Sequence, residues 1–143
     1  KSQKSVIEEL SNAIAGIADE VGNGKINEPL SKNDFTKEES RFSGNSKIDF
    51  ADNMRSIQNI YLGNYLNNGN GDGLSKLISK NNPELHQKIT QEIDNAILKI
   101  ENIPGTFTQA LSNNKAAIQE AQTVVRNLQE TLESELIPYV SNL

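Results

Sequence analysis

The stretch "NPELHQKITQEIDNAILKIENIPG", residues 82–105, carries the clearest structural pattern in the chain and indicates its fold class. Asn82 stands at the position of a helix N-cap, Pro83 suits the first helical position, and Glu84 lies near the positive end of the helix dipole. Apolar residues then recur at steps of three and four, which is the period of one helix face. These residues are Leu85, Ile89, Ile93, Ala96, Ile97 and Ile100. Because proline and glycine at residues 103–105 cannot continue the helix, we predict one amphipathic helix that ends there.

Other segments of the chain show the same period. We predict helices at residues 5–21, 48–64 and 112–136, with a short helical turn at 74–79. The first helix should stop at "GNG", residues 22–24, because glycine accepts the left-handed backbone of a C-cap. Ser46 is the candidate N-cap of the second helix.

These helices, with no alternating strand pattern, predict an all-α fold. We expect one domain, residues 1–143, built as an antiparallel four-helix bundle. The connection between the first and second helices would span residues 22–46, far longer than the roughly 2 to 8 residues that a bundle crossover needs. A connection of that length is either disordered or functional, and we predict an ordered loop.

Composition excludes several classes of function. The chain of 143 residues has a net charge of -5 and no block of Lys and Arg, so we do not expect a nucleic-acid partner. No apolar run approaches the roughly 20 residues of a membrane span, and the N-terminus lacks the apolar core of a signal peptide. The chain does not start with Met, which suggests a processed protein or a fragment of a longer one.

Few residues suit catalysis or metal binding. The absence of cysteine excludes thiolate sites, and His86, the only histidine, excludes a two-histidine zinc helix. We expect His86 to be a structural residue that faces solvent. The calcium-loop pattern at residues 68–73 lacks the carboxylate at its twelfth place, where Ser79 stands, so we predict a flexible turn there. No catalytic triad or phosphate loop has recognisable spacing, and we therefore predict no catalytic residue and no metal ligand.

The stretch "EESRFSGNSKIDF", residues 38–50, has no helical period but is rich in polar and aromatic side chains. In the helix that follows, Asp52, Arg55, Ser56 and Asn59 share one face, and Asp52 and Arg55 are spaced to form an ion pair. This face either binds a ligand or is covered by the preceding loop. In the second case the loop would be held by Glu39, Arg41, Asn45, Asn59 and Tyr61, with Phe35, Phe42 and Phe50 as apolar anchors. The sequence leaves both interpretations open.

A family resemblance rests on these same residues. The strings "ADEVGNGKINEPLSKND", residues 18–34, and "EESRFSGNSKIDFADNMRSIQNIYLGN", residues 38–64, resemble the imelysin family of insulin-cleaving membrane proteases and iron-regulated proteins. The resemblance continues more loosely through "GLSKLISKNNPEL", residues 73–85, and "AILKIENIPGTFTQAL", residues 96–111. It therefore covers essentially the whole chain.

The resemblance implies that this chain is half of a larger protein. Members of the family resemble two packed helical bundles with a GxHxxE motif in the N-terminal bundle, and that motif is absent here. The chain corresponds to the C-terminal bundle, and its partner would be the N-terminal bundle, missing or in a separate chain. The functional site is expected between the halves. This chain would contribute ligand-binding or interface groups: Glu39, Ser40, Arg41, Ser43, Asn45, Asp49, Asn53, Asn59 and Tyr61.

The resemblance also implies a cellular setting. It indicates an exported bacterial protein of the periplasm or cell surface, connected with iron uptake and attached to the membrane only through an upstream lipid anchor. The cofactor stays open; iron or another metal would be bound mainly by the missing half.

Three hypotheses follow. In the first, the chain forms one wall of a binding cleft. In the second, it belongs to a metallopeptidase whose metal motif lies in the absent half, and Glu39 or Asp49 assists the reaction. In the third, it is an autonomous helical interaction module. Peptidase activity is not expected of this chain alone.

Overall fold

The computed structural model describes residues 2–32, 35–38, 44–64 and 73–143. The described elements are α1 (Gln3–Asp19), a π-helical turn η1 (Glu20–Lys25), α2 (Asn27–Lys32), a 3-10 turn η2 (Phe35–Lys37), α3 (Ser46–Leu62), α4 (Leu74–Asn81), α5 (Pro83–Glu101), α6 (Phe107–Asn113), α7 (Lys115–Thr131), a second π-helical turn η3 (Leu132–Leu136) and α8 (Ile137–Ser141). The described residues contain no strand, and the predicted all-α class is confirmed.

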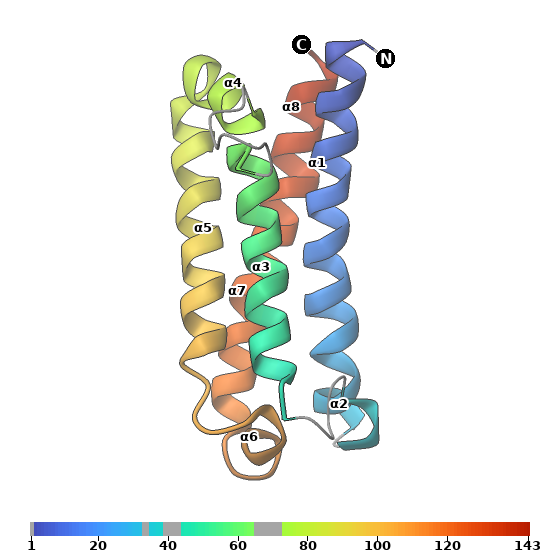
Figure 1. The fold of residues 1–143 in the computed structure, drawn as a ribbon, viewed down its shortest axis with the longest axis vertical. Helices are drawn as coiled ribbons and strands as arrows, with labels where there is room; N and C mark the ends of the chain where they lie inside the picture. The colour runs from blue at the N-terminus through green and yellow to red at the C-terminus, as the bar shows by residue number, and fades with distance from the viewer. Residues whose placement is uncertain (1, 33–34, 39–43, 65–72) are drawn as a thin grey trace.

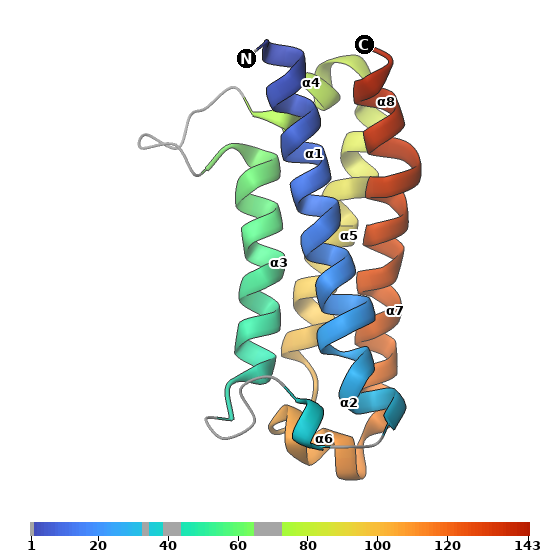
Figure 2. The ribbon, with the colours of Figure 1, turned by 90° about the vertical axis from the view of Figure 1, so that its right-hand side faces the viewer.

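The long helices lie side by side along the long axis of the molecule (Figure 1 and Figure 2). Helix α5 packs against α3 and α7, and α1 packs against α3, α7 and α8. Chain direction alternates between these neighbours, as the colours of Figure 1 show. Helices α2 and α6 lie at one end of the molecule, which we call the base, and α4 lies at the other end, where α1 begins and α8 ends.

The core is made by the apolar faces that the periodicity predicts. Fully buried side chains come from every long helix and include Ile14, Met54, Ile57, Ile93, Val125 and Leu128. The cap of α5 is also as predicted, since the side chain of Asn82 accepts a hydrogen bond from the backbone N–H of Leu85 at 3.3 Å. At the base, Phe50 of α3 meets Phe107 of α6 edge to face, with ring centroids 5.3 Å apart.

The predicted stop of the first helix at residues 22–24 is wrong. The chain continues through η1 and α2 to Lys32, so the connection to α3 is shorter than residues 22–46 and includes the turn η2. Gly22 is buried, and a Cβ at this position would lie 3.1 Å from Cγ1 of Val125 in α7. The glycine therefore allows close packing of η1 on α7. Positive φ angles among the described glycines occur instead at Gly44, Gly63 and Gly105.

Polar side chains of α7 hold η1 in this position. The amide of Gln122 is buried and donates to the carbonyl of Gly22 at 3.0 Å and to Oδ1 of Asn27 at 3.1 Å. Arg126 donates from Nε to Oδ1 of Asn23 at 2.7 Å. A π-helical turn disrupts the regular backbone ladder, and these side chains supply bonds from outside the helix.

The predicted bounds of the last helix, residues 112–136, are also wrong. The separate helix α6 precedes it, with a capping box formed by Thr106 and Gln109, and α7 starts only at Lys115. At the other end the helix continues beyond Leu136 through η3 and α8. A proline in a helix clashes with the carbonyl four residues before it. The π-helical turn just before Pro138 widens the helix, which lets the chain continue past the ring.

Candidate functional site

A buried polar group at the base is the carboxylate of Glu38, whose residue is only 6% exposed. It accepts a hydrogen bond from the hydroxyl of Ser46 at 2.5 Å and another from the hydroxyl of Thr108 at 2.6 Å. Ser46 opens α3 and Thr108 belongs to α6, so one carboxylate ties the incoming segment to two helices. Its negative charge also lies beside the positive end of the α3 dipole.

This contact explains why the predicted cap of α3 is wrong. Asn45 occupies the N-cap position without a side-chain cap bond, and Ser46 is the first helical residue. The hydroxyl of Ser46 donates to Glu38 instead of capping the helix. Gly44, with φ of 71°, supplies the left-handed turn that leads into the helix.

Lys47 fixes the start of α3 to the turn between α5 and α6. Its ammonium group donates to the carbonyl of Ile103 at 2.8 Å and to the carbonyl of Gly105 at 2.6 Å. Two carbonyls of the connection between α5 and α6 thereby gain a donor. The base of α3 is thus held by Glu38 on one side and by the α5–α6 turn on the other.

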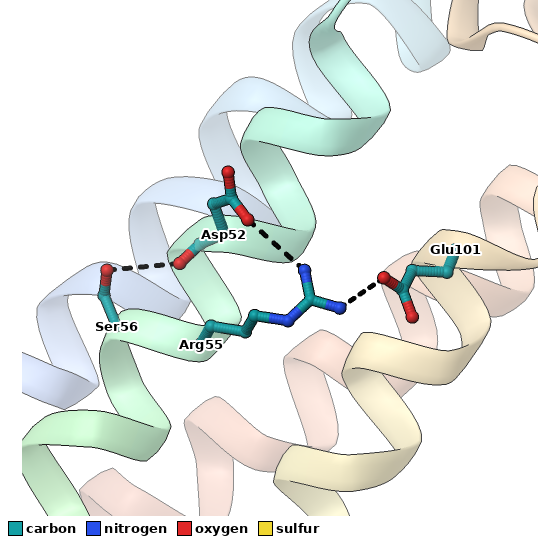
Figure 3. Close-up of polar contacts among 4 residues, drawn as sticks. All are labelled: Asp52, Arg55, Ser56 and Glu101. Carbon is teal, nitrogen blue, oxygen red and sulfur yellow. Dashed lines mark hydrogen bonds and ion pairs between the residues drawn. The ribbon is translucent and has the colours of Figure 1, made fainter. Parts of the chain in front are cut away.

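Farther along α3, Arg55 bridges to α5 (Figure 3). Its Nη1 lies 3.2 Å from Oδ1 of Asp52, and its Nη2 donates to Glu101. The hydrogen bond to Glu101 is the main cause that raises the pKa of Arg55. The predicted pairing of Asp52 with Arg55 is confirmed, and Glu101 is an additional partner from another helix. Because all three side chains are exposed, the pairs orient the guanidinium more than they stabilise the fold.

Beside Arg55 the surface between α3 and α5 is hollowed. The hollow has a volume of about 240 Å³ and is lined by Lys47, Ile48, Ala51, Arg55 and Glu101. Ile48 is 57% exposed, and Leu98, one turn before Glu101 on α5, is 51% exposed. We call this surface the α3–α5 face and define it by Lys47, Ile48, Ala51, Asp52, Arg55, Leu98 and Glu101.

The structure places the predicted site residues in three groups. Glu39, Ser40, Arg41 and Ser43 lie outside the described residues. Asn45, Asp49 and Asn53 follow each other at four-residue steps, so they share one face of the first half of α3. Asn59 and Tyr61 lie near the other end of α3, and the helix does not bring them to the same place.

Tyr61 is fully buried and has a partner that the sequence did not suggest. Its hydroxyl lies 2.9 Å from Nδ1 of His86, and the two rings stack with centroids 5.7 Å apart. Burial raises the pKa of the Tyr61 phenol. The prediction that His86 faces solvent is wrong, because the imidazole is half-buried against Tyr61. No spacing rule links residues on two different helices, so this pair could be found only from the structure.

The donor chemistry of the face does not suit a metal. Across the described residues no group of three or more His, Cys, Asp or Glu side chains is placed to hold a metal ion. Both carboxylates of the α3–α5 face, Asp52 and Glu101, are engaged by Arg55. The face therefore offers hydrogen bonds and apolar contacts.

Among the helices of the described ranges, none has the length and apolarity that crossing a bilayer requires.

Comparisons with known proteins identify relatives over nearly the whole chain. The sequence matches the profile of the Imelysin family over residues 1–134. It is 25% identical over 134 residues to the "Iron-regulated protein A" of Synechococcus elongatus, covering 92% of this chain and 38% of that protein.

Two crystal structures are similar. An imelysin peptidase from Bacteroides ovatus superposes with a TM-score of 0.87 and 32% identity, over 99% of this chain and 42% of that chain. A protein from Parabacteroides distasonis, described as an iron-regulated protein A precursor, gives a TM-score of 0.72 and 30% identity, over 83% of this chain and 36% of that chain. The chain thus spans about two fifths of the length of its first relatives, 38% and 42% respectively.

Proposed function

The chain belongs to the imelysin family, and from this premise we propose that its α3–α5 face forms one wall of a binding cleft that a second helical bundle completes. The complete protein would be an exported bacterial protein that serves iron uptake, with this chain as its C-terminal bundle. The names of the relatives support the link to iron, since two of them are described as iron-regulated protein A.

The observation that carries the proposal is the exposure of Ile48 and Leu98 on either side of the Arg55–Glu101 bridge. They are 57% and 51% exposed, and within the described helices the only other exposed large apolar side chain is Val6 of α1, at 40%. Apolar residues beside an oriented arginine are typical of the central part of a protein interface. The relatives have more chain than this one, which supplies a candidate for the covering surface.

Arg55 gives the face its binding chemistry. A guanidinium carries five N–H donors in a planar fork, and the contacts to Asp52 and Glu101 hold that plane in one orientation. A ligand carboxylate, or an acidic side chain of the second bundle, would meet a donor that needs little ordering on binding. The hollow of about 240 Å³ next to it has room for a small group.

The proposed metal of the complete protein would take its ligands from outside the described part of this chain. The carboxylates of the face are oriented by Arg55, and the chain would supply positioning groups around the metal site. This division of roles agrees with the expected placement of the GxHxxE motif in the N-terminal bundle.

Radical footprinting of the complete protein tests the proposal. In this chain Ile48 is 57% exposed and Val6, on α1, is 40% exposed, so the chain alone predicts faster oxidation of Ile48. If a second bundle covers the α3–α5 face, the order reverses and Val6 is oxidised several times faster than Ile48 or Leu98. Oxidation of Ile48 at a rate equal to or above that of Val6 would rule out the cleft wall.

A second candidate is favoured by the description of the Bacteroides ovatus protein as an imelysin peptidase. In that case the complete protein would be a metallopeptidase with its metal in the other half. Asp49, half-buried in the first turn of α3, would assist from this side. Peptidase activity that is abolished by a chelator and reduced at least tenfold by Asp49→Asn would support this function. Activity that survives the chelator would refute it.

A further inference from the structure

A hollow of about 290 Å³ lies between α5 and the end of α7, where the π-helical turn η3 begins. The charged residues that line it are one base, Lys88, and three acids, Glu92, Glu130 and Glu135. None of them belongs to the α3–α5 face, so the chemistry of this junction is independent of the function proposed above.

One carboxylate oxygen of Glu92, in α5, is buried and unpaired. Among the described residues, its Oε1 is the one buried side-chain oxygen or nitrogen without a hydrogen-bond partner. The residue as a whole is half-buried. An ionised oxygen that is removed from water without a donor is costly, because nothing replaces its hydration. Such groups are rare in folded proteins, so this one calls for a physical explanation.

The neighbours of Glu92 only partly offset this cost. Burial is the largest influence and raises the pKa of Glu92 above its ordinary value of 4.5, and the negative charge of Glu135 also raises it. The hydroxyl of Thr131, a buried residue of α7, and the charge of Lys88 favour the ionised form. However, Lys88 is exposed and donates to Glu135, so much of its charge is screened. Glu130, which faces the same hollow from α7, is negative and exposed.

The turn η3 makes this junction easier to loosen than a regular helix would be. A π-helical turn departs from the usual backbone ladder, and such turns are frequent at functional sites. Thr131 ends α7 directly before η3, and Glu135 lies within it. Two groups that influence the charge of Glu92 are therefore held by the least regular part of the helix that joins α7 to α8.

We propose that the carboxyl of Glu92 makes the contact of α5 with η3 a pH-sensitive junction, tight when the carboxyl holds a proton and looser when it is ionised. The proton comes from solvent and binds one carboxylate oxygen. The neutral acid no longer repels Glu135, and its buried oxygen costs less to keep from water. An open hollow is not required, because further burial would raise the pKa of Glu92 further.

The sign of the pH dependence follows from the direction of the shift. Because the pKa of Glu92 is raised in the folded state, the folded protein holds a proton that the unfolded chain releases. The stabilisation is fully present below pH 4.5 and is lost as the pH rises through the pKa of the folded state.

Urea unfolding of the complete protein and of its Glu92→Gln variant at pH 4, 5.5 and 7.5 tests the pH dependence. Glutamine has the shape of glutamate but cannot ionise. The unfolding equilibrium constant of the unchanged protein, divided by that of the variant, should rise at least about threefold from pH 4 to pH 7.5. A constant cost of the new amide cancels, since only the change with pH is used. A ratio that stays constant or falls would overturn the proposal.

The matched control is Glu133→Gln, which removes a carboxylate from an exposed position of η3. The same ratio, taken with this variant, should not change with pH. If both variants give the same change, the effect is one of net charge and the role assigned to Glu92 is wrong.

Hydrogen exchange followed by mass spectrometry shows whether the effect lies at the junction. At pH 7.5 the backbone amides of η3 and α8 should exchange at least about threefold more slowly in Glu92→Gln than in the unchanged protein, and at pH 4 the two proteins should agree. Comparing proteins at one pH removes the pH dependence of the chemical exchange step. The other π-helical turn, η1, is the internal control and should exchange equally in both. Unchanged exchange of η3 at pH 7.5, or an equal change at η1, would contradict a local junction.

Thr131→Val shifts the balance in the opposite direction. Valine lacks the hydroxyl that favours ionised Glu92, so the unfolding equilibrium constant of this variant, divided by that of the unchanged protein, should rise with pH. In a protein that also carries Glu92→Gln, the rise should disappear, because no charge remains for the hydroxyl to stabilise. A rise that persists would show that Thr131 does not act through Glu92 and would count against the proposed junction.

Discussion

At the scale of single residues, the carboxylate of Glu38 shows how one side chain can organise the base of the molecule. A buried carboxylate is costly unless donors satisfy it, and Glu38 receives hydroxyl donors from both α3 and α6. The next residues in sequence, 39–43, carry four of the predicted site residues. Glu38 therefore fixes where that segment begins relative to α3.

Replacing Glu38 with glutamine should destabilise the protein by about 1 to 2 kcal/mol. Glutamine has the same shape as glutamate, but its hydrogen bonds to the two hydroxyls are neutral and therefore weaker. Because its NH₂ group is a donor, the hydroxyl that faces it must accept a hydrogen bond instead of donating one. Urea unfolding monitored by circular dichroism measures the effect. Glu130→Gln, the same change at an exposed position of α7, should alter the free energy of unfolding by less than about 0.5 kcal/mol. Equal effects of the two variants would show that Glu38 has no special role.

Tyr61 should make the stability depend on pH in the alkaline range. Burial raises its pKa above the ordinary value of 10.0, so the folded protein keeps a proton that the unfolded chain releases. Its contribution is fully present below pH 10.0 and is lost as the pH rises further, with a slope of at most about 1.4 kcal/mol per pH unit.

The variant Tyr61→Phe isolates this effect. Urea unfolding at pH 8, 10 and 11 should show a smaller loss of stability above pH 10.0 than in the unchanged protein. Near neutral pH the variant should lose about 0.5 to 1.5 kcal/mol, because the hydrogen bond to His86 is gone. Tyr139→Phe removes the same group from α8 and should keep the full alkaline loss, since Tyr61 is still present. If Tyr61→Phe retains the full loss, the phenol does not cause it.

At the scale of elements, the glycines of η1 have different roles that a pair of substitutions can separate. Gly22→Ala should destabilise the protein by about 1 to 3 kcal/mol, because the new Cβ would lie 3.1 Å from Val125 and force η1 away from α7. Gly24→Ala meets no atom within 4 Å and should be neutral or stabilise by up to about 1 kcal/mol. Thermal unfolding of the two variants measures the difference. Similar effects would mean that η1 does not depend on close packing.

The same glycines show what sequence reasoning could predict and what it could not. Apolar periodicity predicted that each long helix exists, because burial of one face is a local property of the sequence, but the end of the first helix and the bounds of the last were wrong. The sequence does not show, however, whether a glycine ends a helix or allows two helices to pack closely. Gly22 allows close packing, and this role depends on its contact with Val125, about a hundred residues away in the sequence. Pro138 posed a similar problem, since a proline usually ends a helix but here follows a π-helical turn.

The candidate site was predictable to a smaller extent. The pairing of Asp52 with Arg55 follows from spacing on one helix, and the structure confirms it. Glu101 and Thr108 come from other helices, so their contacts with Arg55 and Glu38 depend on tertiary packing. Ile48 lies four residues before Asp52, so helical spacing already places it on the polar face of α3, in agreement with its exposure of 57%. Its neighbour Leu98 on α5 follows only from the tertiary packing.

At the scale of the whole molecule, the two ends and the α3–α5 face have different chemistry. The base is held by polar side chains around Glu38 and Lys47, and the opposite end has an apolar hollow with a basic rim. Helices α3 and α5 run side by side along the long axis (Figure 1), and the α3–α5 face lies on the half of α3 that begins at the base.

If a second bundle covers the α3–α5 face, substitutions at its exposed apolar positions should lower the stability of the complete protein more than surface substitutions usually do. In the complete protein, Ile48→Lys together with Leu98→Lys should reduce the free energy of unfolding by about 2 to 4 kcal/mol, because two half-exposed apolar side chains lose their burial and two charges enter the interface. If both positions face water, the same changes should cost less than about 0.5 kcal/mol each, as is usual for surface positions. Val6→Lys, on α1 outside the face, is the matched control and should have this small effect in either case. Denaturant unfolding of the three forms distinguishes the two outcomes, and a small effect of the double substitution would show that nothing packs on the face.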